Sequence, residues 1–185
     1  MLAREWRICA ADVQNDFLLK VRPVYVEHHV TEAINALGEE LASESAGNNP
    51  VAFRVAVEGE ARNLHHILRD EIYKIAAEAL RNAFRQSQAK QVEVEIRYDD
   101  EQFRLRVRDD GKGIDGAVLS GDGAQGHYGL HGMRERATVI GGKLTIWSEV
   151  DAGTEVELGL PGNLAYARPP RPSWFSRRFS RKARK

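Results

Sequence analysis

Apolar and polar residues alternate with regular periods along much of the chain, and each period predicts a type of secondary structure. A period of two predicts five strands, at about residues 51–57, 91–98, 102–109, 143–149 and 153–160. Helical spacing of apolar residues predicts three helices, at about residues 31–44, 63–88 and 130–140. Thr31 stands at the start of the first helix, where its hydroxyl is expected to cap the N-terminus.

The order of these elements predicts the architecture. After the first helix come a strand, the long helix, a hairpin, a glycine-rich loop, a helix and a second hairpin. This order predicts an α+β fold, a two-layer α/β sandwich with helices on one face of a mixed, mostly antiparallel sheet. We expect residues 31–162 to form this domain. Residues 1–30 have no sustained period and receive no assignment, and residues 163–185 are expected to be a basic, disordered tail.

Composition supports a folded domain whose charge is unevenly distributed. The 185 residues suit a single domain of ordinary size, and 42% hydrophobic residues are enough to build a core. Eight basic and no acidic residues lie between Arg168 and Lys185, so the net charge of zero is the sum of an acidic domain and a basic tail. This balance argues against nucleic-acid binding by the domain, whereas the tail could contact acidic surfaces.

Two other classes of protein are disfavoured by the residues present. The single cysteine, Cys9, allows neither an intrachain disulfide nor a cysteine-rich zinc site. No apolar run reaches the roughly 20 residues of a membrane span. We therefore expect a soluble chain in a reducing compartment.

Polar residues with chemical potential stand at the ends of apolar elements. Glu78 and Asn82 are four residues apart on the long predicted helix, so their side chains leave the same face. Asp109 ends an apolar strand and is followed by Gly111 and Gly113, which allow a ligand ring to approach the backbone closely.

Glycines dominate the segment that follows. Eight of the 22 residues from Gly111 to Gly132 are glycine, which predicts a loop that approaches a ligand. Gly126, Gly129 and Gly132 lead into a predicted helix. Free backbone N–H groups and the positive end of the helix dipole make such a start suitable for phosphate.

Other nucleotide and metal motifs fit less well. The string GKGIDG at residues 111–116 has the spacing of a dinucleotide fingerprint, but the preceding strand belongs to a hairpin and no helix follows directly. The P-loop pattern fails because no Gly-Lys pair is followed by Ser or Thr. The histidine pairs at 28–29 and 65–66 are poor chelates, since adjacent helical residues point about 100° apart.

Four short motifs occur in a fixed order: EALRNA at 78–83, RDDGKGI at 108–114, GHYGLHGMRERA at 126–137 and AGTEVEL at 152–158. They closely resemble the N box, the two glycine boxes and the terminal Gly-Thr box of the GHKL ATPases, a superfamily that includes the catalytic domains of sensor histidine kinases. The form GLHGMRERA is most similar to kinases of the nitrate-sensor and degradation-sensor type. The resemblance covers about residues 31–161 and implies the Bergerat-type ATP-binding fold.

The resemblance also implies a site for ATP and Mg²⁺ and a role for each matched residue. Asn82 would ligate Mg²⁺, and Glu78 would act on the nucleophile near the γ-phosphate. Asp109 would accept a hydrogen bond from the adenine amino group, which Thr154 would support through water. Residues from about 115 to 128 would form a lid over the triphosphate. Further nucleotide-binding positions implied are Arg85, Gly111, Gly113, Gly126, Gly129, Leu130 and Gly132.

The chain departs from the family pattern in two respects. Gln86 stands where close relatives commonly have a histidine or an aromatic residue. No histidine is followed by Asp or Glu, as the acceptor histidine of such kinases is. We therefore expect a cytoplasmic catalytic domain, or the cytoplasmic part of a membrane-bound sensor, that does not phosphorylate itself. Its partners would be a separate acceptor helix and a response regulator. A serine kinase of the anti-sigma-factor type and a non-catalytic nucleotide-binding module remain the alternatives.

Overall fold

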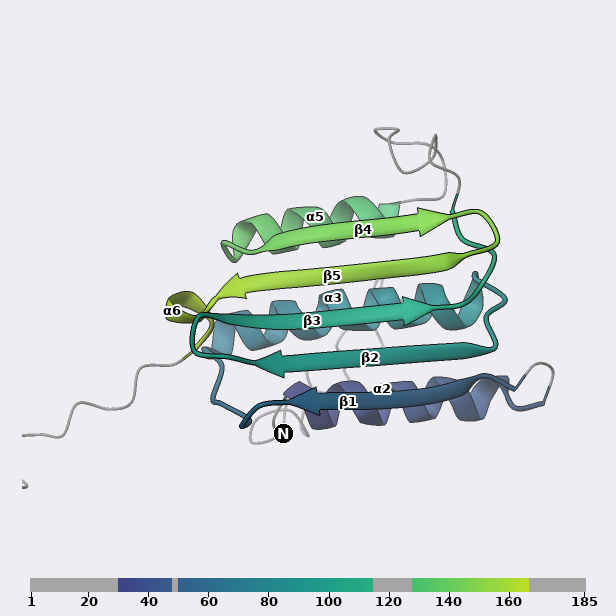
Figure 1. Ribbon diagram of the computed structural model, residues 1–185, viewed down its shortest axis with the longest axis horizontal. Coiled ribbons are helices and arrows are strands. Elements are labelled where there is room, and N and C mark those ends of the chain that lie inside the picture. The colour runs from purple at the N-terminus through teal and green to yellow at the C-terminus, as the bar shows by residue number, and fades with distance from the viewer. Residues whose placement is uncertain (1–29, 48–49, 115–127, 167–185) are drawn as a thin grey trace, which may run out of the picture.

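The computed structural model describes residues 30–47, 50–114 and 128–166, which form one sheet and a layer of helices (Figure 1). The strands are β1 (Ala52–Glu58), β2 (Gln91–Tyr98), β3 (Gln102–Asp109), β4 (Lys143–Glu149) and β5 (Gly153–Pro161). The helices are α2 (Val30–Ser45), α3 (His66–Arg85), α5 (Tyr128–Val139) and the short α6 (Gly162–Ala165). Each strand and the three longer helices lie where the periodicity predicts them.

The sheet is mixed and mostly antiparallel, as predicted. The strand order is β1-β2-β3-β5-β4, and only the β1–β2 pair is parallel. The parallel pair follows from the connection, because α3 crosses from the end of β1 back to the start of β2. At one end of the sheet, the register sets Asp109 of β3 opposite Thr154 of β5, and Thr154 opposite Ser148 of β4.

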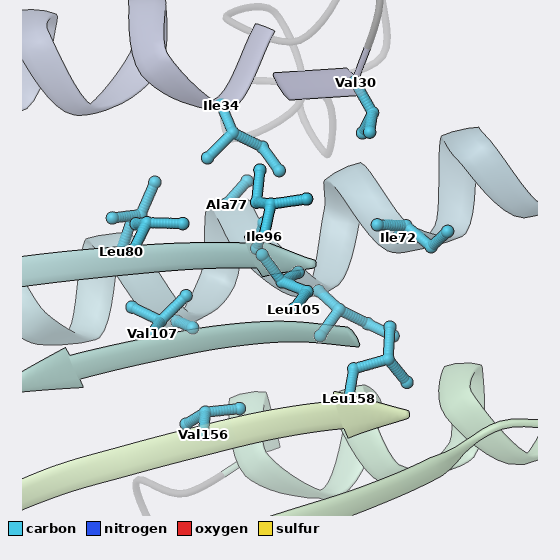
Figure 2. Close-up of a cluster of buried hydrophobic side chains, with 14 of the residues drawn as sticks. Val30, Ile34, Ile72, Ala77, Leu80, Ile96, Leu105, Val107, Val156 and Leu158 are labelled. Carbon is cyan, nitrogen blue, oxygen red and sulfur yellow. The ribbon is translucent and has the colours of Figure 1, made fainter. Parts of the chain in front are cut away.

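The helices α2, α3 and α5 all cover the same face of the sheet (Figure 1). Their apolar stripes meet the alternate apolar residues of the strands in one core, part of which Figure 2 shows. Ile72 and Leu80 of α3 and Ile96 of β2 are fully buried there. This packing fixes the orientation of α3, and therefore the direction in which its polar residues point.

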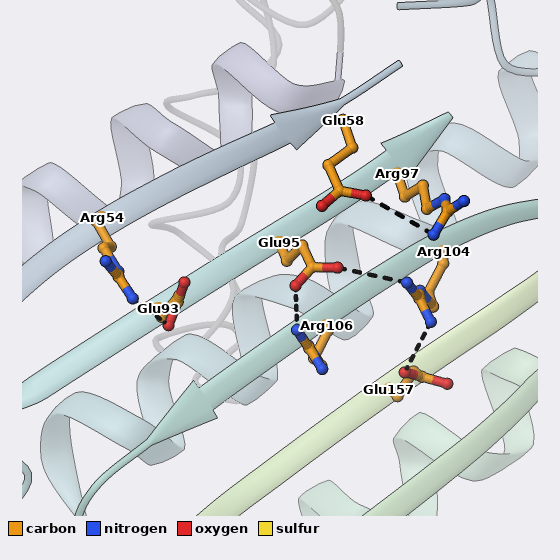
Figure 3. Close-up of polar contacts among 8 residues, drawn as sticks. All are labelled: Arg54, Glu58, Glu93, Glu95, Arg97, Arg104, Arg106 and Glu157. Atoms are coloured by element: carbon orange, nitrogen blue, oxygen red, sulfur yellow. Dashed lines mark hydrogen bonds and ion pairs between the residues drawn. The ribbon is translucent and has the colours of Figure 1, made fainter. Parts of the chain in front are cut away.

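Within the described part of the chain, the opposite face of the sheet carries mostly charged side chains and no helix lies over it. Glutamates of β2 and β5 alternate with arginines of β1 and β3, so oppositely charged side chains lie on neighbouring strands (Figure 3). Glu95 forms ion pairs with both Arg104 and Arg106, and Arg54 contacts Glu93 at 2.8 Å. These pairs are solvent-accessible, so each contributes little stability, but together they keep this face polar.

Two expectations about the domain ends are wrong. Thr31 lies inside the first turn of α2, where its hydroxyl contacts the Tyr98 hydroxyl at 2.8 Å. Residues 163–166, expected in the tail, belong to the domain. Ala165 is fully buried, and the Arg62 guanidinium lies 4.1 Å from the centre of the Tyr166 ring. A helix of four residues is too short for its periodicity to be recognised in the sequence.

Candidate nucleotide-binding site

A cavity of about 310 Å³ lies between α3, the start of α5 and the ends of β3 and β5. Residues of all four sequence motifs line it. The lining residues are Glu78, Ala79, Asn82, Gln86, Ser87, Val107, Asp109, Lys112, Gly113, Ile114, Gly129, Leu130, Thr154 and Val156. Chain segments far apart in the sequence therefore meet at one hollow, as a ligand-binding site requires.

Helix α3 supplies Glu78 and Asn82 to one wall of the cavity. The helix buries Ala79 and Leu80 in the core, which leaves Glu78 and Asn82 half-buried at its border. A Cβ atom at Gly129 would meet the carboxylate end of the Glu78 side chain, so the start of α5 lies directly against this wall. Within the described residues, no group forms a hydrogen bond with the side-chain amide of Asn82.

Asp109 lies at the inner end of the cavity with only 5% of its surface exposed. Its carboxylate accepts a hydrogen bond of 2.9 Å from the Gly111 backbone N–H. Burial raises the pKa of the Asp109 carboxyl above its usual value, although the hydrogen bond from the Gly111 backbone N–H acts in the opposite direction. The result is a buried acceptor with room beside it for a donor from a ligand.

Asp110, the next residue, has a structural role. Its carboxylate oxygen accepts hydrogen bonds from the backbone N–H groups of Lys90 and Gln91, each at 2.8 Å. These bonds fix the start of β2 beside the end of β3. Asp109 and Asp110 therefore face different sides of the strand and do different work.

Ser87, which the sequence interpretation missed, joins the end of α3 to the glycine-rich loop. Its backbone carbonyl accepts the Lys112 N–H at 2.8 Å, and its hydroxyl donates to the Ala83 carbonyl at 2.5 Å. A Cβ at Gly111 would collide with the Ser87 carbonyl. Gly111 is thus needed behind Asp109, although it does not line the cavity itself.

The turn between β4 and β5 holds the other side of the same loop. Asp151 N–H donates to the Lys112 carbonyl at 2.8 Å, and Ile114 N–H donates to the Ser148 hydroxyl at 2.7 Å. Gly113 has φ +68°, and a Cβ there would collide with the Glu149 carbonyl. Only glycine fits this position without strain.

The structure does not bring every predicted residue to the cavity. Arg85 points away from it, toward Glu44 of α2 at 3.8 Å, with more than half of its side chain exposed. Gly132 lies on α5 and does not line the cavity. Gly126 and most of the expected lid, residues 115–127, lie outside the described residues. Gly129, Leu130 and Thr154 line the cavity.

The donor set suits Mg²⁺ only when a ligand supplies further oxygens. The described residues contain no cluster of three or more His, Cys, Asp or Glu side chains that could hold a metal alone. Mg²⁺ in nucleotide sites is commonly held by one or two protein ligands together with phosphate oxygens. The uncommitted amide oxygen of Asn82 fits that mode, and Lys112 is the one cation among the described lining residues.

Comparisons with known proteins agree with this site. The family described as "Histidine kinase-, DNA gyrase B-, and HSP90-like ATPase" matches residues 67–164. The sensor histidine kinase LiaS of Bacillus subtilis is 32% identical over 156 residues, which cover 82% of this chain and 41% of LiaS. The sensor protein VraS of Staphylococcus saprophyticus is 38% identical over 96 residues, covering 52% of this chain and 26% of VraS.

Solved structures show the same fold. The histidine kinase domain of the blue-light activated histidine kinase of Erythrobacter litoralis superposes with a TM-score of 0.55 at 20% identity, covering 73% of this chain and 62% of that domain. The family match includes the described cavity residues from Glu78 to Val156. The chain belongs to the histidine kinase-, DNA gyrase B- and HSP90-like ATPase family, and its relatives are sensor histidine kinases. It spans about two fifths of the length of LiaS and a quarter of that of VraS.

Proposed function

We propose that this domain binds ATP with Mg²⁺ and transfers the γ-phosphoryl group to a histidine on an acceptor helix, as the catalytic domain of a two-component sensor histidine kinase. The observation that carries the proposal is the meeting of Glu78, Asn82, Asp109 and Thr154 around one cavity. The family match and the relatives support it.

The residues divide the cavity into two ends with different tasks. Asp109 and Thr154 lie side by side on β3 and β5, where they would recognise the adenine ring. Glu78 and Asn82 lie on α3 beside the start of α5, where they would face the phosphates. When bound with ATP, Mg²⁺ neutralises charge on the phosphate oxygens, and Asn82 would hold it there.

In the transfer step, the bond between the γ-phosphorus and the bridging oxygen of ADP breaks and a bond to the imidazole nitrogen forms. Glu78 would accept the proton that the imidazole loses. Positioning and charge neutralisation would supply most of the catalysis, as in other phosphoryl transfers. We also propose a response regulator as the next partner and the cytoplasm as the location. Among the described residues, no helix is long and apolar enough to cross a membrane.

The test combines the chain, γ-labelled ATP, Mg²⁺ and a purified acceptor-helix domain of a sensor histidine kinase. Acid-labile label on the acceptor is the expected result. Acid-stable label would indicate a serine kinase, and nucleotide binding without transfer to any of several acceptor domains would indicate a regulatory module. Either result would overturn the proposal.

Two variants separate the roles of the α3 residues. Asn82→Ala should weaken ATP binding by roughly tenfold or more, because the Mg²⁺ that neutralises the phosphates would lose its protein ligand. Glu78→Ala should leave affinity near that of the unaltered chain but reduce transfer by roughly 10²- to 10⁴-fold, as expected for a lost general base. Calorimetry measures the first effect and label transfer the second. If Glu78→Ala binds ATP as weakly as Asn82→Ala, Glu78 has no separate catalytic role.

A further inference from the structure

Ser148 lies behind the cavity wall, next to Thr154 on the neighbouring strand β4. Its hydroxyl oxygen makes three contacts: 2.7 Å to the Ile114 backbone N–H, 2.9 Å to the Gly153 carbonyl oxygen and 2.9 Å to the Thr154 hydroxyl. Nothing in the proposed transfer reaction uses this side chain. Its contacts nevertheless fix the chemical character of a residue that lines the cavity.

The number of available protons decides the direction of each hydrogen bond. A serine hydroxyl has one proton to donate and two lone pairs to accept with. The Gly153 carbonyl can only accept, so the Ser148 proton goes to it. The Ile114 N–H can only donate, so it takes one Ser148 lone pair. The remaining contact must therefore be donated by the Thr154 hydroxyl.

Thr154 consequently has no free proton for a ligand. Its oxygen presents lone pairs to the cavity, beside the carboxylate of Asp109, which is also an acceptor when ionised. The two residues form an edge that accepts hydrogen bonds and donates none from these side chains. A purine with an amino group at position 6 suits such an edge, whereas a purine with a carbonyl there brings a third acceptor against it.

We propose that Ser148 is a specificity-determining positioning residue. Because it accepts the hydrogen bond from the Thr154 hydroxyl, the edge of the cavity that contacts the base can only accept hydrogen bonds. Such an edge favours 6-amino purine nucleotides over 6-oxo purine nucleotides. This inference rests on the proposed binding of ATP in the cavity. It adds a residue that acts on selectivity through Thr154 without touching the nucleotide.

The test compares the affinities for ATP and inosine triphosphate, which differ in the amino or carbonyl group at position 6 of the purine and in the proton that the 6-oxo base carries on N1. Ser148→Ala releases the Thr154 hydroxyl to rotate and donate to a 6-carbonyl. The ratio of ATP to inosine triphosphate affinity should therefore fall by roughly two- to tenfold, the value of one net hydrogen bond. Ser148→Thr keeps a hydroxyl at this position, so the ratio of ATP to inosine triphosphate affinity should equal that of the unaltered chain.

A matched control uses the same strand. Thr145→Ala removes a hydroxyl from the exposed face of β4 and should leave the ratio unchanged. Ser148→Ala also removes the acceptor of the Ile114 N–H, and this structural loss lowers the affinities for both nucleotides together. Only a change in the direction of the Thr154 hydroxyl alters the ratio of the two affinities. In a Thr154→Val background, Ser148→Ala should no longer change the ratio.

The outcomes distinguish the inference from the proposed function. If the unaltered chain prefers ATP and Ser148→Ala keeps the same ratio, the role of Ser148 is refuted while ATP binding stands. If Ser148→Ala still lowers the ratio of ATP to inosine triphosphate affinity in the Thr154→Val background, the role of Ser148 is refuted as well. If the unaltered chain binds neither nucleotide, the proposed function itself fails.

Discussion

Replacing Asp109 by asparagine tests the base-binding end of the cavity most directly. The carboxylate is almost fully buried and already accepts one hydrogen bond, from Gly111 N–H. Hydrogen bonds to charged groups contribute about 1.5–3 kcal/mol. At about 1.4 kcal/mol per factor of ten, Asp109→Asn should weaken binding of ATP and ADP by roughly 10- to 150-fold.

The same substitution should not destabilise the protein without nucleotide. Burial raises the folded-state pKa of Asp109, so the folded state binds this proton more tightly than the unfolded state does. The ionised carboxylate therefore lowers the free energy of unfolding as pH rises from the unfolded pKa through the folded pKa, and that cost remains at pH 7. Asparagine removes the charge and can still accept the Gly111 N–H. The unfolding midpoint of Asp109→Asn in urea at pH 7 should equal or exceed that of the unaltered chain.

Asp110→Ala provides the matched control, one residue further along. It removes the hydrogen bonds to Lys90 and Gln91 and should lower the unfolding free energy by about 1 kcal/mol while affinity for ADP stays within about twofold. Calorimetric titration with ADP and urea unfolding of each variant measure both quantities. Unchanged ADP affinity in Asp109→Asn would refute its assignment to the base.

Three further substitutions test the glycine-rich loop, helix α5 and the end of α3. Gly113→Ala should lower the unfolding free energy, measured by urea titration, by at least about 2 kcal/mol, because the positive φ of this residue and the nearby Glu149 carbonyl oppose a side chain. Gly132→Ala on α5, where a Cβ atom would meet open space, should be neutral or stabilising in the same titration. Arg85→Ala should change ATP affinity by less than about twofold, because Arg85 faces Glu44; a larger calorimetric loss would show that it reaches the phosphates.

Local periodicity was sufficient to predict the elements, since most of them have one strongly apolar face. It could not predict how distant strands pair. The insertion of β5 between β3 and β4 depends on contacts across more than 40 residues, which no local pattern records. Short or context-dependent features were missed for the same reason. Thr31 looks like a helix cap, but Tyr98, 67 residues away along the chain, is its partner.

Spacing in the sequence placed side chains together correctly where the backbone alone determines their direction. Glu78 and Asn82 share a helix face by spacing alone, and the structure brings both to the cavity. Arg85 also follows Asn82 at helical spacing, yet its long side chain turns toward α2. A flexible side chain at the border of a helix can reach several neighbours, so its spacing does not determine its partner.

The polar end of the cavity follows from one rule applied to three strands. In β3, Phe103, Leu105 and Val107 face the helices, and Asp109 continues the same alternation. Thr154 continues the inward positions of β5, and Ser148 those of β4. Each strand thus exchanges an apolar residue for a polar one at the same end of the sheet. Alternation alone marks each of the three as inward-facing. Only the register aligns them in one row, where the proton of one hydroxyl determines what its neighbour can offer a ligand.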